Sequence, residues 1–174
     1  MESHKKRHAI HKKRHAIHEA GHVVVAISFG WVVKSVDIKD MHSPNWEEIG
    51  GTTTLVAPNL DAAPTIESKK AWNFLYGVQY AAGCAAESLL LGNFSGGEAD
   101  FRELDKLGLE TSGNLFENQR LHYVTVAKAI LQQNMNFQAL NWLSDELEEK
   151  EILNQAEIFR ILIEAREDVS ERSS

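Results

Sequence analysis

The histidines are the sequence feature that most restricts the fold, because six of the eight lie within the first 22 residues. The segment 4–10, HKKRHAI, is repeated at once as 11–17, and HEAGH follows at 18–22. Seven residues make nearly two helical turns, so the repeat keeps its phase and places all six histidines within an arc of about 80°. The pattern predicts one helix over residues 8–28, with Gly30 near its end.

Charge is distributed unevenly along the chain. Residues 1–14 sum to +5 and the other 160 residues to −12, within a total of −7. The acidic body excludes a uniformly basic nucleic-acid binder, and the single cysteine, Cys84, excludes a disulfide scaffold. A length of 174 residues with 43% apolar residues fits one domain with a core.

Two observations favour a cytoplasmic protein. No apolar run approaches the roughly 20 residues that span a bilayer. The basic start is followed by a second basic block rather than by the apolar segment of a signal peptide. Residues 1–14 are then a basic, histidine-rich arm, which is either a helix extension from a recent duplication or an artefact.

The rest of the chain predicts a mainly α fold with a small β-sheet or hairpin. Two β-branched runs, 32–38 and 52–56, are typical of strands. Apolar residues recur with helical spacing over Glu67–Leu91, which predicts one helix stopped by Gly92. Loops are expected at 41–48, 59–64 and 93–97, helices at 99–107, 117–134, 137–149 and 155–166, and a frayed end at 170–174.

The sequence at 18–22 matches the H-E-x-x-H pattern of zinc enzymes. On a helix, His18 and His22 lie one turn apart on one face, so both rings reach one metal ion. Glu19 lies beside that face and is placed to take a proton from water and pass it to a leaving amine. The two upstream histidine pairs enclose Lys-Lys-Arg instead, and cations disfavour a nearby Zn²⁺.

A catalytic zinc site needs a third protein ligand. The metzincin pattern would put glycine at 25 and histidine at 28, but Val25 and Ser28 stand there. The remaining candidates are the carboxylates Glu87, Glu98 and Asp100, among which spacing alone does not choose.

Several motifs in the same order resemble the peptidase domain of the FtsH family of zinc metalloproteases. The similarity covers roughly residues 15 to 165. The matching segments are HEAGHVVVA at 18–26, VKSVDI at 33–38, GGTTTL at 50–55, GCAAES at 83–88, SGGEADF at 95–101, AKAIL at 127–131, LNWL at 140–143 and EKEIL at 149–153.

The resemblance implies a helical zincin-type peptidase domain over 15–168, flanked by the arm 1–14 and a frayed tail 169–174. It implies Asp100 as the third zinc ligand, and it leaves Glu87 either as a carboxylate that holds a histidine N–H or as a helix-packing residue. Ser95 and Gly97 replace the threonine and alanine of the family motif. The sequence has no G-x-x-x-x-G-K-[ST] phosphate loop and no membrane anchor, so we expect no ATP binding.

These observations lead to one principal expectation and two alternatives. The principal one is an ATP-independent zinc metalloendopeptidase that cleaves peptides or unfolded proteins, with the edge of strand 52–56 holding an extended substrate. The first alternative is a catalytically silent zinc-binding scaffold that partners an ATPase or another protein, and a homo-oligomer fits either reading. The second is that the basic arm contacts nucleic acid or an anionic membrane surface.

Overall fold

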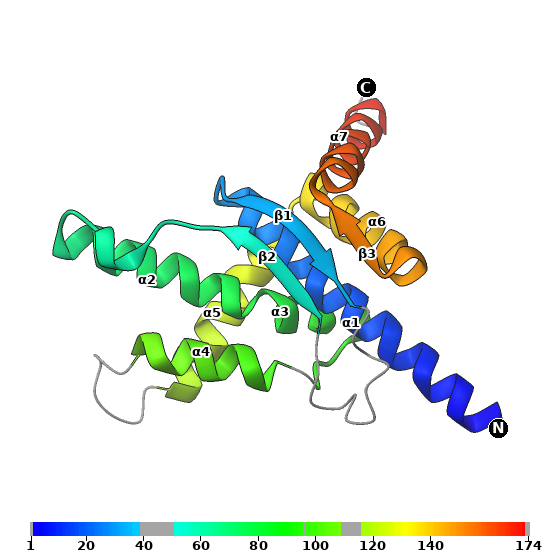
Figure 1. The fold of residues 1–174 in the computed structure, drawn as a ribbon, viewed down its shortest axis with the longest axis horizontal. Coiled ribbons are helices and arrows are strands. Elements are labelled where there is room, and N and C mark those ends of the chain that lie inside the picture. Colours follow the sequence, from blue (N-terminus) through cyan, green and yellow to red (C-terminus); the bar gives the residue numbers. More distant parts are fainter. Residues whose placement is uncertain (1, 39–50, 96, 109–115, 173–174) are drawn as a thin grey trace.

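The computed structural model describes residues 2–38, 51–95, 97–108 and 116–172. Within them the chain is mainly helical, with one small sheet (Figure 1). The predicted mainly α fold with a small sheet is therefore confirmed, while the predicted loop 41–48 lies outside the described residues. The elements are α1 (Glu2–Ser28), β1 (Val32–Asp37), β2 (Thr52–Val56), the 3-10 turn η2 (Leu60–Ala62), α2 (Ile66–Tyr80), α3 (Ala82–Leu91), α4 (Glu98–Gly108), α5 (Phe116–Leu131), α6 (Asn134–Lys150), β3 (Ile152–Asn154) and α7 (Gln155–Arg172).

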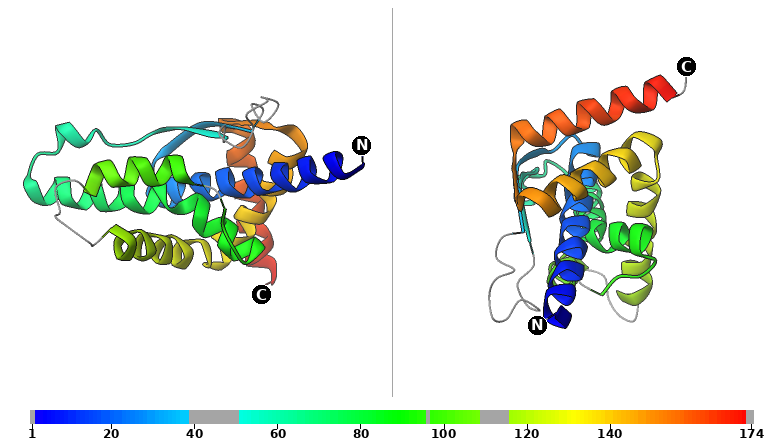
Figure 2. Two further views of the ribbon diagram at one scale, coloured as in Figure 1. Left: turned by 90° about the horizontal axis from the view of Figure 1, so that it is seen from below. Right: turned by 90° about the vertical axis from the view of Figure 1, so that its right-hand side faces the viewer.

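The first helix, α1, runs through the centre of the molecule. Its second half is buried, with every residue from Ala16 to Val25 less than a tenth exposed, as expected for a helix enclosed by other elements. α3 and α6 pack along it, and β1 and β2 also contact it. Its first turns project away from the body (Figures 1 and 2). The helix predicted over 8–28 is confirmed and extends further, to Glu2.

The sheet has three antiparallel strands in the order β2–β1–β3. The two predicted strands pair with each other, with an irregularity between Val33 and Ser35 that shifts the register by one residue. The third strand, β3, was not predicted. It pairs with the far side of β1, where Val36 lies opposite Leu153, and it leaves β2 as an edge of the sheet among the described residues.

The single helix predicted over 67–91 is wrong in one respect, because the structure has two helices that meet at Ala81. Gly92 ends the second helix in a left-handed conformation, as the sequence indicates. The sequence around this break contains neither a proline nor a run of polar residues that would predict it. It lies at a close approach of α3 to α1, since a Cβ on Gly21 of α1 would overlap the Ala82 carbonyl and the Ala86 side chain.

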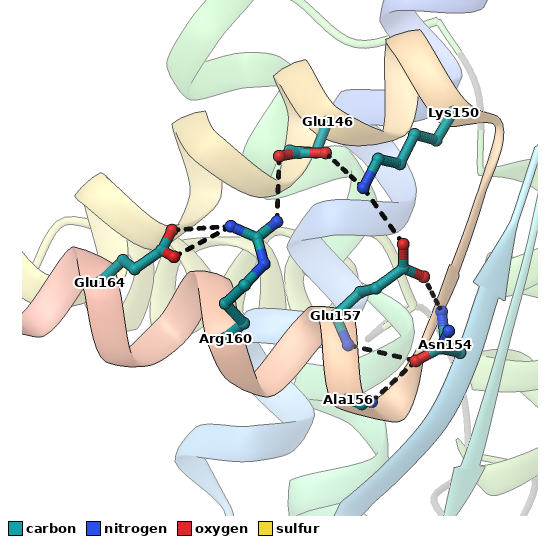
Figure 3. Close-up of polar contacts among 7 residues, drawn as sticks. All are labelled: Glu146, Lys150, Asn154, Ala156, Glu157, Arg160 and Glu164. Atoms are coloured by element: carbon teal, nitrogen blue, oxygen red, sulfur yellow. Dashed lines mark hydrogen bonds and ion pairs between the residues drawn. The ribbon is translucent and has the colours of Figure 1, made fainter.

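Helices α6 and α7 are joined through a polar network at their surface (Figure 3). Glu157 accepts the Asn154 N–H at 3.0 Å, and the Asn154 side chain accepts the Ala156 and Glu157 N–H groups. This reciprocal capping box fixes the start of α7 directly after β3. The network also contains Glu146 and Lys150 of α6 with Arg160 and Glu164 of α7.

The end of α7 differs from the prediction. The helix continues to Arg172 rather than ending near Arg166, so residues 169–172 of the expected frayed tail are helical. An ion pair between Arg172 and Asp168, one turn apart, supports the last turn at 3.1 Å. None of the described helices combines the length and apolar character that crossing a membrane requires.

Candidate metal centre

Two imidazoles lie side by side on the buried part of α1. His18 and His22 are 8% and 7% exposed, and their ring centroids are 4.9 Å apart. Because α1 is helical through both positions, the four-residue spacing puts the rings on one face, as predicted. Ligand atoms of His18, Glu19 and His22 all lie within 4.8 Å of one another, so this cluster could hold a metal ion.

Asp100 approaches the same point from α4. Its Oδ2 atom lies 2.9 Å from Nε2 of His18 and 3.5 Å from Nε2 of His22. Ligand atoms at the corners of a tetrahedral zinc site, with bonds near 2.05 Å, are separated by roughly 3.3 Å. The distances from Asp100 Oδ2 to the two Nε2 atoms lie just below and just above this separation.

A close approach between the loop before α4 and α3 brings Asp100 into place. Gly97 has a φ of 87°, and a Cβ there would overlap the Sγ atom of Cys84. Phe101 then donates its N–H to the Gly97 carbonyl at 2.8 Å, which starts α4 and leaves Asp100 in its first turn. Glycine is therefore required at 97 both for its backbone conformation and for space.

Both histidines use their second ring nitrogen in a hydrogen bond. Nδ1 of His18 donates to Oε1 of Glu87 at 2.7 Å, and Nδ1 of His22 donates to the Gln79 carbonyl at 2.8 Å. A proton fixed on Nδ1 directs Nε2 of each ring toward the shared point, which is the arrangement found in metal-binding histidines. A Cβ on Gly83 would overlap the His18 ring, so α3 can pass this close only with glycine there.

Gln79 is a site residue that the sequence analysis missed. It lies in the last turn of α2, immediately before the helix breaks at Ala81. Its carbonyl accepts from the His22 ring, and its side-chain amide donates to the His22 carbonyl at 3.0 Å. The interruption of the helix therefore coincides with a two-point contact that orients one of the imidazoles.

Glu87 was a candidate ligand from the sequence, and the structure places it behind His18 rather than beside Asp100. The carboxylate is 1% exposed. Besides His18, it accepts a hydrogen bond from Arg14 and one from the Ser95 N–H at 3.2 Å. Arg14, which the sequence analysis had assigned to the N-terminal arm, thus contacts the body of the protein.

Glu19 faces the sheet. Its Oε2 atom accepts a hydrogen bond from the Thr53 hydroxyl of β2 at 2.7 Å, and the residue is 5% exposed. A Cβ on Gly51, just before β2, would overlap the Cγ atom of Glu19. The Gly-Thr sequence at the start of this strand therefore leaves space for the carboxylate and supplies a donor to it. Neither Thr53 nor Gly51 was identified as a site residue from the sequence.

The electrostatic field at the two histidines favours positive charge. Burial by itself would lower the pKa of His18, but its hydrogen bonds to Asp100 and Glu87 outweigh burial and raise that pKa to about 10. Burial also opposes the charge on Asp100, yet the neighbouring His22 and His18 hold the pKa of the Asp100 carboxyl well below its usual range. Two carboxylates that stabilise a proton here would also stabilise a metal cation.

Two other residues near the cluster are not part of it. Glu98 is exposed on α4, two residues before Asp100. Cys84 is buried on α3, where burial first and then the Glu87 and Asp100 charges raise the pKa of the thiol to about 12. The structure thus brings together His18, Glu19, His22, Glu87 and Asp100.

No protein-family model matches this chain, and no curated protein matches it either.

Proposed function

We propose that this chain is a zinc metalloendopeptidase of the FtsH-like zincin type, acting on peptides or unfolded protein segments. The observation that carries the proposal is the convergence of His18 Nε2, His22 Nε2 and Asp100 Oδ2 on one point beside the Glu19 carboxylate. Two imidazoles and one carboxylate are a ligand set typical of catalytic zinc, which keeps a fourth position for water or substrate.

His18, His22 and Asp100 would hold the ion. When bound, zinc would polarise the scissile carbonyl and make water more acidic. The ion fits this donor set because both Nδ1 atoms are already committed to Glu87 and Gln79, which leaves the Nε2 atoms for the metal.

Glu19 would act as the general base and then as the general acid. One of its oxygens accepts from Thr53, which fixes the orientation of the carboxylate beside the proposed metal position. It would take a proton from the attacking water and deliver it to the leaving amine. Its near-complete burial protects that proton from exchange with bulk solvent.

The edge strand β2 would hold the substrate. An extended peptide can add to a free strand edge by main-chain hydrogen bonds. Thr53 belongs to this strand and also contacts Glu19, so a peptide paired with β2 would lie next to the proposed base. Strand addition requires an extended backbone, so the substrates would be short peptides or unfolded segments.

A Glu19→Gln variant tests this function. The substitution keeps the size of the side chain and removes the base, so zinc content should remain at the wild-type level while cleavage of an unfolded casein-like substrate disappears. Wild-type cleavage must also stop on addition of a chelator and return with zinc. Cleavage by Glu19→Gln at the wild-type rate would contradict the mechanism, and a zinc-loaded wild type without activity would favour a silent scaffold.

A further inference from the structure

The Glu87 carboxylate carries more interactions than a packing role requires. It lies at 1% exposure and accepts hydrogen bonds from the His18 ring, from the Arg14 guanidinium and from the Ser95 backbone N–H. An ionised carboxylate buried to this degree is costly unless a charged partner compensates it. The identity of that partner therefore matters for the whole arrangement.

His18 cannot be the charged partner while it is a metal ligand. A ligating imidazole is neutral, because the metal takes the place of its second proton. Arg14 remains, since a guanidinium keeps its charge at any ordinary pH. Its side chain is 18% exposed, which keeps its ion pair with Glu87 only partly screened by solvent.

The guanidinium is also fixed at a second point. Its Nη2 atom donates to the Asn93 side chain at 2.9 Å, while Nη1 donates to Glu87. Asn93 and Ser95 belong to the segment between α3 and α4, which leads to Asp100 five residues after Ser95. One side chain of α1 thus contacts both the carboxylate behind His18 and the loop that precedes the third candidate ligand.

We propose that Arg14 is a positioning residue of the metal centre: it holds Glu87 in the orientation that aims His18 Nε2 at the ion. This inference rests on the proposed function. It also makes a distinctive prediction. A cation near a metal site repels the ion, so by repulsion alone its removal should strengthen metal binding. If Arg14 positions the ligands, its removal should weaken metal binding instead.

The chain offers a matched control. Lys13 is the neighbouring residue on α1, carries the same charge and is exposed. Its replacement by glutamine measures the effect of removing one positive charge near the site. Arg14→Gln removes the same charge together with the ion pair to Glu87. Arg14→Lys keeps the charge but lacks the two-nitrogen fork that contacts Glu87 and Asn93 together.

The experiment is a titration of the metal-free full chain with Co²⁺, whose visible absorption reports ligand geometry, followed by Zn²⁺ competition against a chelator. Arg14→Gln should lose about tenfold in metal affinity and change the Co²⁺ spectrum, as loss of an outer hydrogen-bond partner typically does. Arg14→Lys should recover part of the loss, and Lys13→Gln should bind as tightly as wild type or more tightly. Equal affinities for Arg14→Gln and Lys13→Gln would overturn the inference.

Two further outcomes are distinguishable. A wild type that binds neither metal would remove the proposed function and this inference with it, whereas a metal-binding wild type with an unaffected Arg14→Gln would remove the inference alone. If circular dichroism shows that Arg14→Gln is unfolded, Asn93→Ala decides, because it removes only the second acceptor of the Arg14 fork. A smaller loss of affinity supports the positioning role, and wild-type affinity contradicts it.

Discussion

Nδ1 of His18 donates to Oε1 of Glu87 across 2.7 Å, between residues that are 69 positions apart in the sequence. The bond joins the central helix to α3 and orients the His18 ring. The same Glu87 carboxylate also accepts hydrogen bonds from Arg14 and from the Ser95 N–H. Glu19 is fixed in a similar way by the Thr53 hydroxyl at 2.7 Å.

Replacing Glu87 by glutamine should weaken zinc binding by about 10- to 100-fold. The amide oxygen can still accept from His18, but the charge that polarises the ring is lost, and the amide NH₂ would meet the donors of Arg14 or Ser95. Affinity is measured by competition with a chelator. Glu98→Gln on the exposed start of α4 is the control. Unchanged zinc affinity in Glu87→Gln would show that this carboxylate has only a packing role.

Replacing Thr53 by valine should reduce peptide cleavage without reducing zinc content. Valine has a similar shape but cannot donate to Oε2 of Glu19, so the carboxylate loses the contact that fixes it. The measurement is kcat at saturating substrate together with metal analysis. Thr54→Val is the matched control, because Thr54 is exposed on the same strand. Equal losses in the two variants would point to strand stability rather than to the base.

Replacing Gly83 by alanine should displace His18. The new Cβ would overlap the imidazole ring, and the backbone of α3 cannot easily retreat because it packs against α1. We expect weaker zinc binding and a destabilisation of about 1–3 kcal/mol, the usual cost of overpacking a core. Thermal unfolding and chelator competition measure the two effects. Ser88→Ala, further along α3, should change neither. Normal zinc affinity in Gly83→Ala would contradict the packing described here.

Much of the fold could be predicted from the sequence, because it rests on local patterns. The repeat and the H-E-x-x-H pattern keep one helical phase, which predicted α1. The β-branched runs predicted β1 and β2. The strand β3 was missed because three residues are too few to show a period, and it forms by pairing with the far side of β1. The break at Ala81 was missed because it coincides with contacts to α1 rather than with a helix-breaking residue.

The site residues divide in the same way, into those set by local sequence patterns and those set by tertiary contacts. His18, Glu19 and His22 could be found from their spacing alone, since neighbours on a helix face are set by the sequence. Glu87, Glu98 and Asp100 were equal candidates for the third ligand by spacing, and a family resemblance was needed to choose Asp100. Gln79, Thr53 and Arg14 carried no signal: a backbone carbonyl, a hydroxyl in a threonine run and one of six early cations become site residues only through tertiary contacts.

The Cys84 thiol should be unreactive in the folded, metal-free protein. Burial and the neighbouring Glu87 and Asp100 charges raise its pKa to about 12, above the ordinary value of 9.0, so the thiolate that alkylating reagents attack is scarce at pH 8–9. The protonated thiol favours the fold below pH 9, and that contribution is lost as the pH rises toward 12. Alkylation followed by mass spectrometry should be slow in buffer and fast in urea. Rapid labelling at pH 8 in buffer would contradict this burial.

The most direct test of the proposed metal centre is the zinc content of purified wild type, Asp100→Ala and Glu98→Ala. The two variants each remove one carboxylate from the first turn of α4, but only Asp100 lies within 2.9 Å of a His18 nitrogen. We predict about one zinc ion per chain in wild type and in Glu98→Ala, as for a single catalytic site, and a large loss in Asp100→Ala. Full zinc occupancy in Asp100→Ala, or none in wild type, would contradict the account.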